Sequence, residues 1–157
     1  SGHAYARARS LTGFTLLEIL VAIAVISTLS LVTINGLISF RDTSLLAHAA
    51  DEAEGALKKA RSRTLSAYGG SQHGVYFGTS TLVLFRGSAY SASDPFNEIV
   101  SLPRVEVAQT TLPNQSVSFR RLSGQATATG TVIFRVSNNP ARTKTIVIYE
   151  SGLVEVQ

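Results

Sequence analysis

The N-terminal part of the chain contains one long apolar run. Between Phe14 and Phe40, a stretch of 27 residues, the only ionisable side chain is that of Glu18. As a helix this stretch would be roughly 40 Å long, which is enough to cross the ~30 Å hydrocarbon core of a membrane. The segment Ile19–Ile26 is apolar on all sides and offers no amphipathic face to a soluble core. We therefore expect residues 14–40 to form a membrane-spanning helix.

The charges on either side of this run predict its orientation. Arg7 and Arg9 precede it without a nearby acid, whereas the two charges that follow it cancel each other. The positive-inside rule therefore places residues 1–13 in the cytoplasm and the rest of the chain outside. A secretory signal peptide is the alternative. Its nearest cleavage pattern, Ala22-Ile23-Ala24, lies inside the run, and cleavage there would leave an apolar stub.

Composition and motifs exclude several classes of function. The net charge of +4 falls to +2 without Arg7 and Arg9, which weakens the case for a nucleic-acid binder. The chain has no cysteine, so it has no disulfide framework, thiolate zinc site or cysteine nucleophile. His3, His48 and His73 lack acidic neighbours at the spacing of metal ligands. Nucleotide-binding and hydrolase motifs are also absent from the sequence. We expect no metal, no cofactor and no enzymatic activity.

Glu18 lies about one helical turn inside the apolar run. A carboxylate at such a position is costly unless a cation neutralises it, and the nearest cation, Arg9, lies beyond Gly13. Cleavage after Gly13 would create an α-amino group at Phe14, one turn from Glu18. That amine could meet this carboxylate or the carboxylate of a neighbouring subunit. The alternative is that Glu18 lies among the lipid headgroups.

The six residues of Gly13–Glu18, with the sequence GFTLLE, follow a basic leader and precede the apolar run. This arrangement resembles the processing site of type IV pilins and of the pseudopilins of type II secretion. The resemblance implies that a prepilin peptidase cuts between Gly13 and Phe14 and N-methylates Phe14. It also implies that Glu18 pairs with the Phe14 amine of a neighbouring subunit during assembly.

The same resemblance implies partners and a location. The partners would be other pilin or pseudopilin subunits, the prepilin peptidase, the inner-membrane assembly platform and, before assembly, membrane lipid. The subunit would be stored in the bacterial inner membrane as a single-pass protein, with its N-terminus in the cytoplasm and its head outside. It would then enter a pilus or pseudopilus filament.

After Phe40 the apolar pattern becomes amphipathic, which predicts a second helical segment over residues 41–68, ended by Gly69-Gly70. Glu54 and Lys58 have the acid-first order that stabilises a helix. Small apolar residues recur at spacings of three and four on one narrow face, namely Leu46, Ala50, Ala53, Leu57, Ala60, Thr64 and Ala67.

Residues 69–157 show the two-residue alternation of strands and predict a β-rich globular head. The expected strands are Val75–Phe77, Thr81–Arg86, Ile99–Leu102, Val105–Thr110, Ser116–Leu122, Thr131–Val136, Thr143–Tyr149 and Leu153–Val156. The apolar side chains on one face of these strands must pack against another element to be shielded from water. The main ones are Val75, Phe77, Leu82, Leu84, Val132, Phe134, Ile146 and Ile148. The expected fold class is α+β, a long N-terminal helix packed on an antiparallel sheet. The pilin resemblance implies the same form.

Within the family, three segments look most like an H-type pseudopilin or a related minor pilin: Leu57–Ser62, Tyr68–Phe77 and Ser151–Val156. Some of those minor pilins bind DNA in natural competence through an arginine-rich final strand. Here Leu153, Glu155 and Gln157 stand in that strand, and Glu155 would repel phosphate.

Three hypotheses remain open at this point. The first is a structural subunit of a pilus or pseudopilus. The second is a competence-type minor pilin whose head binds DNA through basic residues, with Arg120, Arg121, Arg135, Arg142 and Lys144 as the candidate contacts. The third is a single-pass anchored domain that does not polymerise.

Overall fold

The computed structural model describes residues 13–157, except that the side chains of residues 31–35 lie outside the described part. Residues 1–12 of the predicted leader, with Arg7 and Arg9, also lie outside the described residues. The chain divides into two compact units, Ser1–Ser39 and Phe40–Gln157.

One helix, α1 (Leu16–Leu65), runs through both units. It begins with a capping arrangement that the sequence pattern Thr-x-x-Glu favours. The Thr15 hydroxyl oxygen accepts a hydrogen bond from the Glu18 N–H at 3.2 Å, and the Thr15 carbonyl accepts one from the Ile19 N–H at 3.2 Å. Thr15 is therefore the N-cap of α1.

In the first unit α1 presents its apolar side chains to the outside. Each large apolar side chain described there is at least half exposed, from 50% for Val25 to 79% for Phe14. Among the described residues, no helix combines the length and the hydropathy that a membrane crossing requires. The predicted span, residues 14–40, includes residues 31–35, whose side chains are outside the described part, and its membrane-spanning character is not shown.

In the second unit α1 buries one face. The predicted face is confirmed at six positions, all at most 5% exposed: Leu46, Ala50, Ala53, Leu57, Ala60 and Thr64. It is wrong at Ala67, which is exposed. The helix ends at Leu65, before the predicted end, because Ala67 takes the left-handed conformation with φ 52° that terminates helices. A short 3₁₀ turn, η1 (Tyr68–Gly70), follows.

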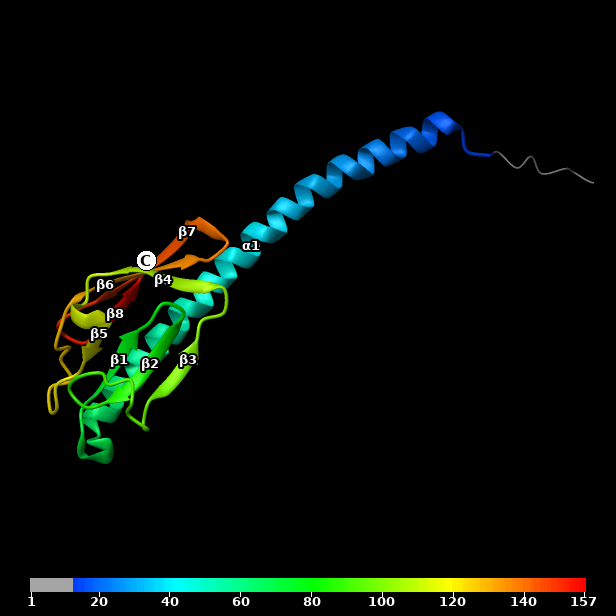
Figure 1. Cartoon of the computed structure of the whole chain (residues 1–157). Helices are drawn as coiled ribbons and strands as arrows, with labels where there is room; N and C mark the ends of the chain where they lie inside the picture. Colours follow the sequence, from blue (N-terminus) through cyan, green and yellow to red (C-terminus); the bar gives the residue numbers. More distant parts are fainter. Residues whose placement is uncertain (1–12) are drawn as a thin grey trace, which may run out of the picture. The chain divides into compact units, whose positions relative to one another are not determined.

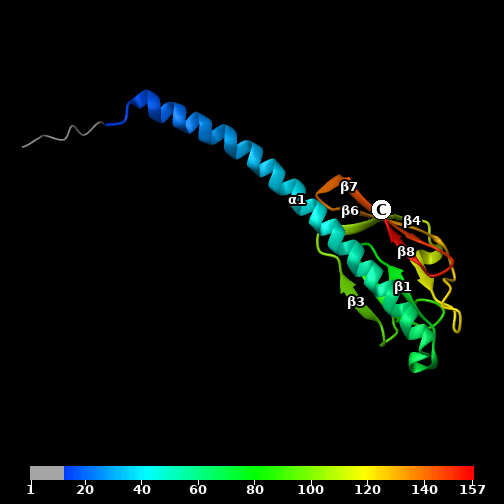
Figure 2. The ribbon, with the colours of Figure 1, turned by 180° about the vertical axis from the view of Figure 1, so that it is seen from behind.

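The strands form two antiparallel sheets of four strands each (Figures 1 and 2). The first sheet has the order β3 (Glu98–Ser101), β2 (Thr81–Arg86), β1 (His73–Phe77), β5 (Ser116–Ser118). The second sheet has the order β4 (Val105–Thr110), β6 (Gly130–Val136), β7 (Asn139–Ile148), β8 (Val154–Val156). A 3₁₀ turn, η2 (Pro113–Gln115), precedes β5.

Two predicted strands differ clearly from the observed ones. β5 ends at Ser118 rather than at Leu122, because the chain turns there and Leu122 is 98% exposed with φ 73°. β7 begins at Asn139 rather than at Thr143. Asn139 pairs with Val136 after a register shift in the ladder, so β7 includes residues that the sequence placed between two strands.

Both sheets and the second half of α1 enclose one hydrophobic core, which extends from Leu46 to Ile148. The eight side chains expected to need a cover are all at most 4% exposed, which confirms the alternation: Val75, Phe77, Leu82, Leu84, Val132, Phe134, Ile146 and Ile148. The sequence did not predict the buried Asp42, which is 7% exposed and accepts a hydrogen bond from the Asn139 side-chain amide at 2.9 Å.

Candidate functional site

The predicted cleavage point lies just before α1. Gly13 is not part of the helix, and a side chain built on it would meet nothing within 4 Å. Phe14 is 79% exposed. The cap residue Thr15 lies on the C-terminal side of the Gly13–Phe14 bond, so a cut there leaves the helix cap in place. Cleavage and methylation at this bond remain predictions.

Glu18 occupies the first turn of α1, where the helix dipole favours a negative charge. Within residues 13–157 no Lys, Arg or His nitrogen lies within ion-pair distance of its carboxylate. The described part of the subunit therefore leaves this charge without a cation. If the surrounding surface becomes buried, the carboxylate needs a partner from elsewhere.

Three hydroxyl groups on the described part of the exposed helix are hydrogen-bonded within the helix. The hydroxyls of Ser27, Thr28 and Ser30 donate to backbone carbonyls of the preceding turn at 2.7–2.9 Å. Such hydroxyls can be buried between helices without leaving an unpaired donor. Glu18 is thus the one ionised group that burial of residues 14–30 would remove from water.

The five candidate DNA contacts do not converge on one surface. Arg135 donates from Nε to the Glu106 carboxylate at 2.6 Å, so its charge is balanced. Lys144 pairs across the sheet with Phe134, and its side chain therefore projects on the opposite face of the second sheet from Arg135. Arg120 and Arg121 lie in the loop after β5, and Arg142 lies in the first half of β7.

A polar cluster at the end of α1 was not predicted from the sequence. The Glu98 carboxylate accepts hydrogen bonds from Lys59 Nζ at 2.7 Å and from Arg63 at 2.5 Å. These two cations lower the pKa of Glu98. The guanidinium of Arg86 lies 3.7 Å from the centroid of the Phe96 ring. The cluster borders a pocket of about 350 Å³.

His73 lines the same pocket and is only 3% exposed. Burial lowers its pKa from the ordinary value of 6.5, and the nearby Arg63 lowers it further. Its Nδ1 has no hydrogen-bond partner among the described residues. The imidazole is therefore neutral near pH 7. Within residues 13–157 no three His, Asp or Glu side chains lie close enough to share a metal ion.

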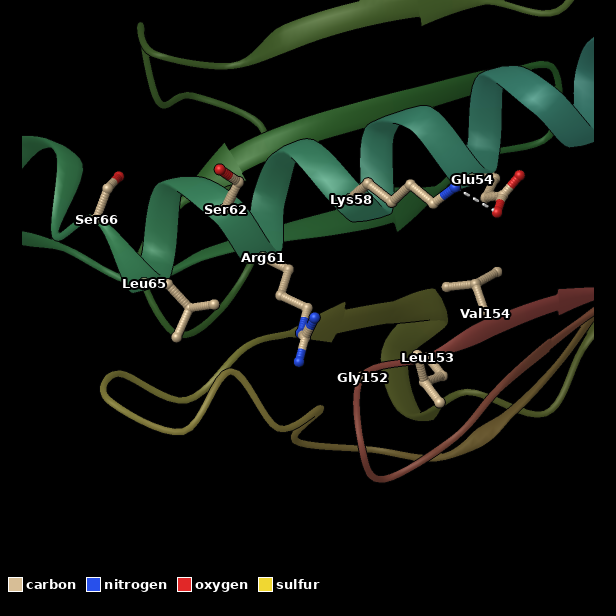
Figure 3. A pocket seen from close by; sticks show the side chains of 9 residues that line it. All are labelled: Glu54, Lys58, Arg61, Ser62, Leu65, Ser66, Gly152, Leu153 and Val154. Atoms are coloured by element: carbon tan, nitrogen blue, oxygen red, sulfur yellow. Dashed lines mark ion pairs between the residues drawn. The ribbon is translucent and has the colours of Figure 1, made fainter.

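A second hollow, of about 790 Å³, lies between α1 and β8 (Figure 3). Lys58 pairs with Glu54 at 2.7 Å on its helical wall, which confirms the predicted pair. Arg61 donates from Nε to the Gly124 carbonyl at 3.0 Å. Leu153 and Val154 form the wall opposite the helix. No pattern in the sequence indicated this hollow, because its two walls are about ninety residues apart along the chain.

Comparison with known proteins supports the fold. No protein-family model matches the chain, and no curated protein matches it. The chain resembles two crystal structures of the type IV minor pilin FimU of Pseudomonas aeruginosa (strain PAO1), in two space groups, with TM-scores of 0.56 and 0.54 and 14% identity. The similarity covers 75% and 71% of this chain and 92% of the FimU chain in each case. The chain therefore has the α+β fold of a type IV pilin.

Proposed function

We propose that this chain is a structural subunit of a pilin-type filament, either a minor pilin of a type IV pilus or a pseudopilin of a type II secretion pseudopilus. The observation that carries the proposal is a pilin-like fold joined to a helix with exposed apolar side chains. The hydrophobic core begins at Leu46, so it uses none of the apolar residues before Phe40. That helical surface is left for other chains.

Contacts between these helical surfaces would stabilise the filament. Side chains such as Leu16 and Leu17, exposed at 77% and 70%, would pass from lipid to contacts with neighbouring helices, where close packing rather than removal from water provides the stabilisation. The self-satisfied hydroxyls of the helix do not oppose burial. The Glu18 carboxylate does oppose it, unless a cation is supplied.

We propose that the cation is the N-methylated amine of Phe14 on the neighbouring subunit. A prepilin peptidase would create this amine by cutting between Gly13 and Phe14. This bond precedes the helix cap, and a side chain built on Gly13 would meet nothing within 4 Å. Before assembly the subunit would be held in the bacterial inner membrane through residues 14–40, with its N-terminus in the cytoplasm and its head outside. The assembly platform and other pilin subunits would then be its partners.

Substitutions of Glu18 test the proposal. Because Glu18 has no cation partner among the described residues of its own chain, Glu18→Leu should leave the processed subunit intact. In the filament, the same substitution leaves the neighbour's Phe14 amine buried without a partner, a loss of about 3–5 kcal/mol per contact. Glu18→Gln should behave like Glu18→Leu, and Glu18→Asp should be intermediate because the charge remains but its reach is shorter.

The measurement is the fraction of mature subunit in sheared filaments against the fraction in the membrane, with the mass of each species. Wild-type subunits should begin at Phe14 and appear in filaments, whereas Glu18→Leu subunits should begin at Phe14 and remain in the membrane. Equal incorporation of both would remove the proposed role of Glu18. A mature wild-type subunit that never enters filaments would instead support an anchored domain that does not polymerise.

A further inference from the structure

Two of the four edge strands in the sheets are protected against pairing with another chain. β4 carries a register shift between Val107 and Gln109, and the Val107 N–H donates outside the sheet to the Thr79 carbonyl at 2.8 Å. On the free side of β5, the Ser118 N–H donates to the Thr127 hydroxyl at 3.1 Å. Irregularities and covering groups of this kind are how edge strands avoid association.

β8 lacks such protection. Thr145 and Gln157 exchange two backbone hydrogen bonds, at 3.1 and 2.8 Å, across the β7–β8 ladder. Because hydrogen-bonding direction alternates along an antiparallel pair, the N–H and C=O groups of Val154 and Val156 point away from β7. No hydrogen bond from these groups is present within residues 13–157. The hollow between α1 and β8 lies along this free edge (Figure 3).

β3 presents an equivalent edge. The Leu102 N–H donates to the Ser80 carbonyl at 2.8 Å in the β2–β3 ladder. The same alternation turns the N–H and C=O groups of Ile99 and Ser101 away from β2. Ile99 is also 67% exposed. Each of the two edges therefore offers two donors and two acceptors at the same spacing along an extended strand.

The two free edges flank α1 on opposite sides (Figures 1 and 2). Glu54, Lys58 and Arg61 line the hollow beside β8, whereas Glu52 and Lys59 line the groove beside β3. A contact that joins one side of a molecule to the opposite side of the next copy is heterologous, and it generates an open helical filament when successive rotations do not close into a ring. This is the type of contact that a polar filament requires.

One charge without an ion pair among the described residues lies beside each edge, and the two charges are of opposite sign. Glu52, on the β3 side, is exposed and has no ion pair within residues 13–157. Arg61, on the β8 side, donates to the carbonyls of Gly124 and Ser151 and contacts no described carboxylate. A second copy placed head to tail would bring Glu52 of one copy toward Arg61 of the other, and neither side chain has an ion pair within the described part of its own chain.

We propose that β3 of one copy pairs edge to edge with β8 of the next copy in the assembled filament, so that the first sheet of one head continues the second sheet of its neighbour. The occupant of the hollow beside β8 is thus the segment Glu98–Ser101 of a second copy of this chain. This inference rests on the proposed filament function and specifies how the heads meet.

Introduced single cysteines test the pairing. The chain contains no cysteine of its own, so each introduced cysteine is the only thiol that a cross-linker can modify. Ile99 lies in β3 and Leu153 directly precedes β8, and their side chains are 67% and 63% exposed. Full-length Ile99→Cys and Leu153→Cys copies, carrying different tags, are produced together and recovered in sheared filaments. A short bis-maleimide should link the two different variants about tenfold more than it links either variant to itself.

Proline substitutions test whether the edge itself is used. Val154→Pro removes an N–H that points away from β7, so the head should keep its melting temperature while mixed cross-linking falls about tenfold. Ile99→Pro should do the same from the other edge. Glu155→Pro is the matched control, because it removes an N–H that faces β7 and should lower the melting temperature of the head.

The outcomes separate this inference from the proposed function. Mixed cross-links that disappear in both outward-facing proline variants support the pairing. Filaments that form normally but give only like-to-like links, links to a different protein, or no links overturn the pairing and leave the filament role intact. Cross-linking that survives in Val154→Pro also overturns it. The proposed function fails separately, if wild-type chains do not enter filaments.

Discussion

Thr64 connects the last turn of α1 to the first strand, and this connection can be tested with isosteric substitutions. Its side chain is 1% exposed. The hydroxyl donates to the Ala60 carbonyl at 2.9 Å and accepts a hydrogen bond from the His73 N–H at 2.9 Å. Since the His73 N–H points away from β2, Thr64 is the partner that satisfies it.

The size of the effect follows from these contacts. Thr64→Val keeps the shape but leaves the His73 N–H buried without a partner, which costs about 1–3 kcal/mol. Thr64→Ser keeps both hydrogen bonds and loses one buried methyl group, which costs about 0.8 kcal/mol. Serine, threonine and valine have similar helix propensities, so helix formation does not explain a difference between the two variants.

Urea unfolding gives the two stability changes, and amide hydrogen exchange locates them. The Val variant should be the less stable. Its His73 amide should exchange faster than in the Ser variant by more than the amides of β6 and β7 do, because those amides report only the difference in global stability. A Ser variant less stable than the Val variant would mean that methyl packing dominates at this position. Unchanged exchange at His73 in the Val variant would show that the hydroxyl does not protect that amide.

Three further predictions concern the second unit. The pKa values of His73 and Glu98 are both lowered in the folded state, so the unfolded chain binds more protons. The free energy of unfolding should therefore fall as the pH drops below 6.5 and again below 4.5. His73→Gln should remove the first decrease, measured by urea unfolding at a series of pH values. Gly152 and Gly70 both have a left-handed backbone, in which alanine costs ~1–2 kcal/mol of the free energy of unfolding. Gly152→Ala should cost more than this, because the new methyl group meets the Gly124 carbonyl oxygen. Gly70→Ala should cost only this amount in the same assay, because the space around Gly70 is open. Residues 40–157 expressed alone should be monomeric and melt cooperatively, because the core lies within them; aggregation in light scattering would contradict this.

The periodicity of the sequence was sufficient to predict most of the core. Small apolar residues at helical spacing marked the buried face of α1, and two-residue alternation marked the inward side chains of the strands. The prediction went wrong where a local pattern continued past its structural end. Leu122 continues the alternation of β5 but lies in a turn, and Asn139 has the chemistry of a turn residue but pairs in a strand.

The candidate sites differed in how far the sequence could predict them. The Gly13–Glu18 segment is contiguous, so its pattern is visible without a structure. The division into two sheets, the free edges of β3 and β8 and the pocket around His73 depend on which distant strands pair. A single sequence does not contain that information, because alternation gives the face of a side chain but not the neighbour of its strand.

The buried bond between Asp42 and Asn139 gives the second unit a defined mechanical attachment. Asp42 lies near the start of that unit on α1, and Asn139 begins β7 next to the β6 hairpin. A tensile load that enters through the N-terminal part of α1 would reach this bond before it reaches the core around Leu57. The long β6–β7 ladder behind Asn139 would then share the load among many hydrogen bonds. Asn139→Ala should therefore lower the force at which a pulled subunit first yields, and it should also lower the free energy of unfolding, because the buried Asp42 carboxylate loses this hydrogen bond.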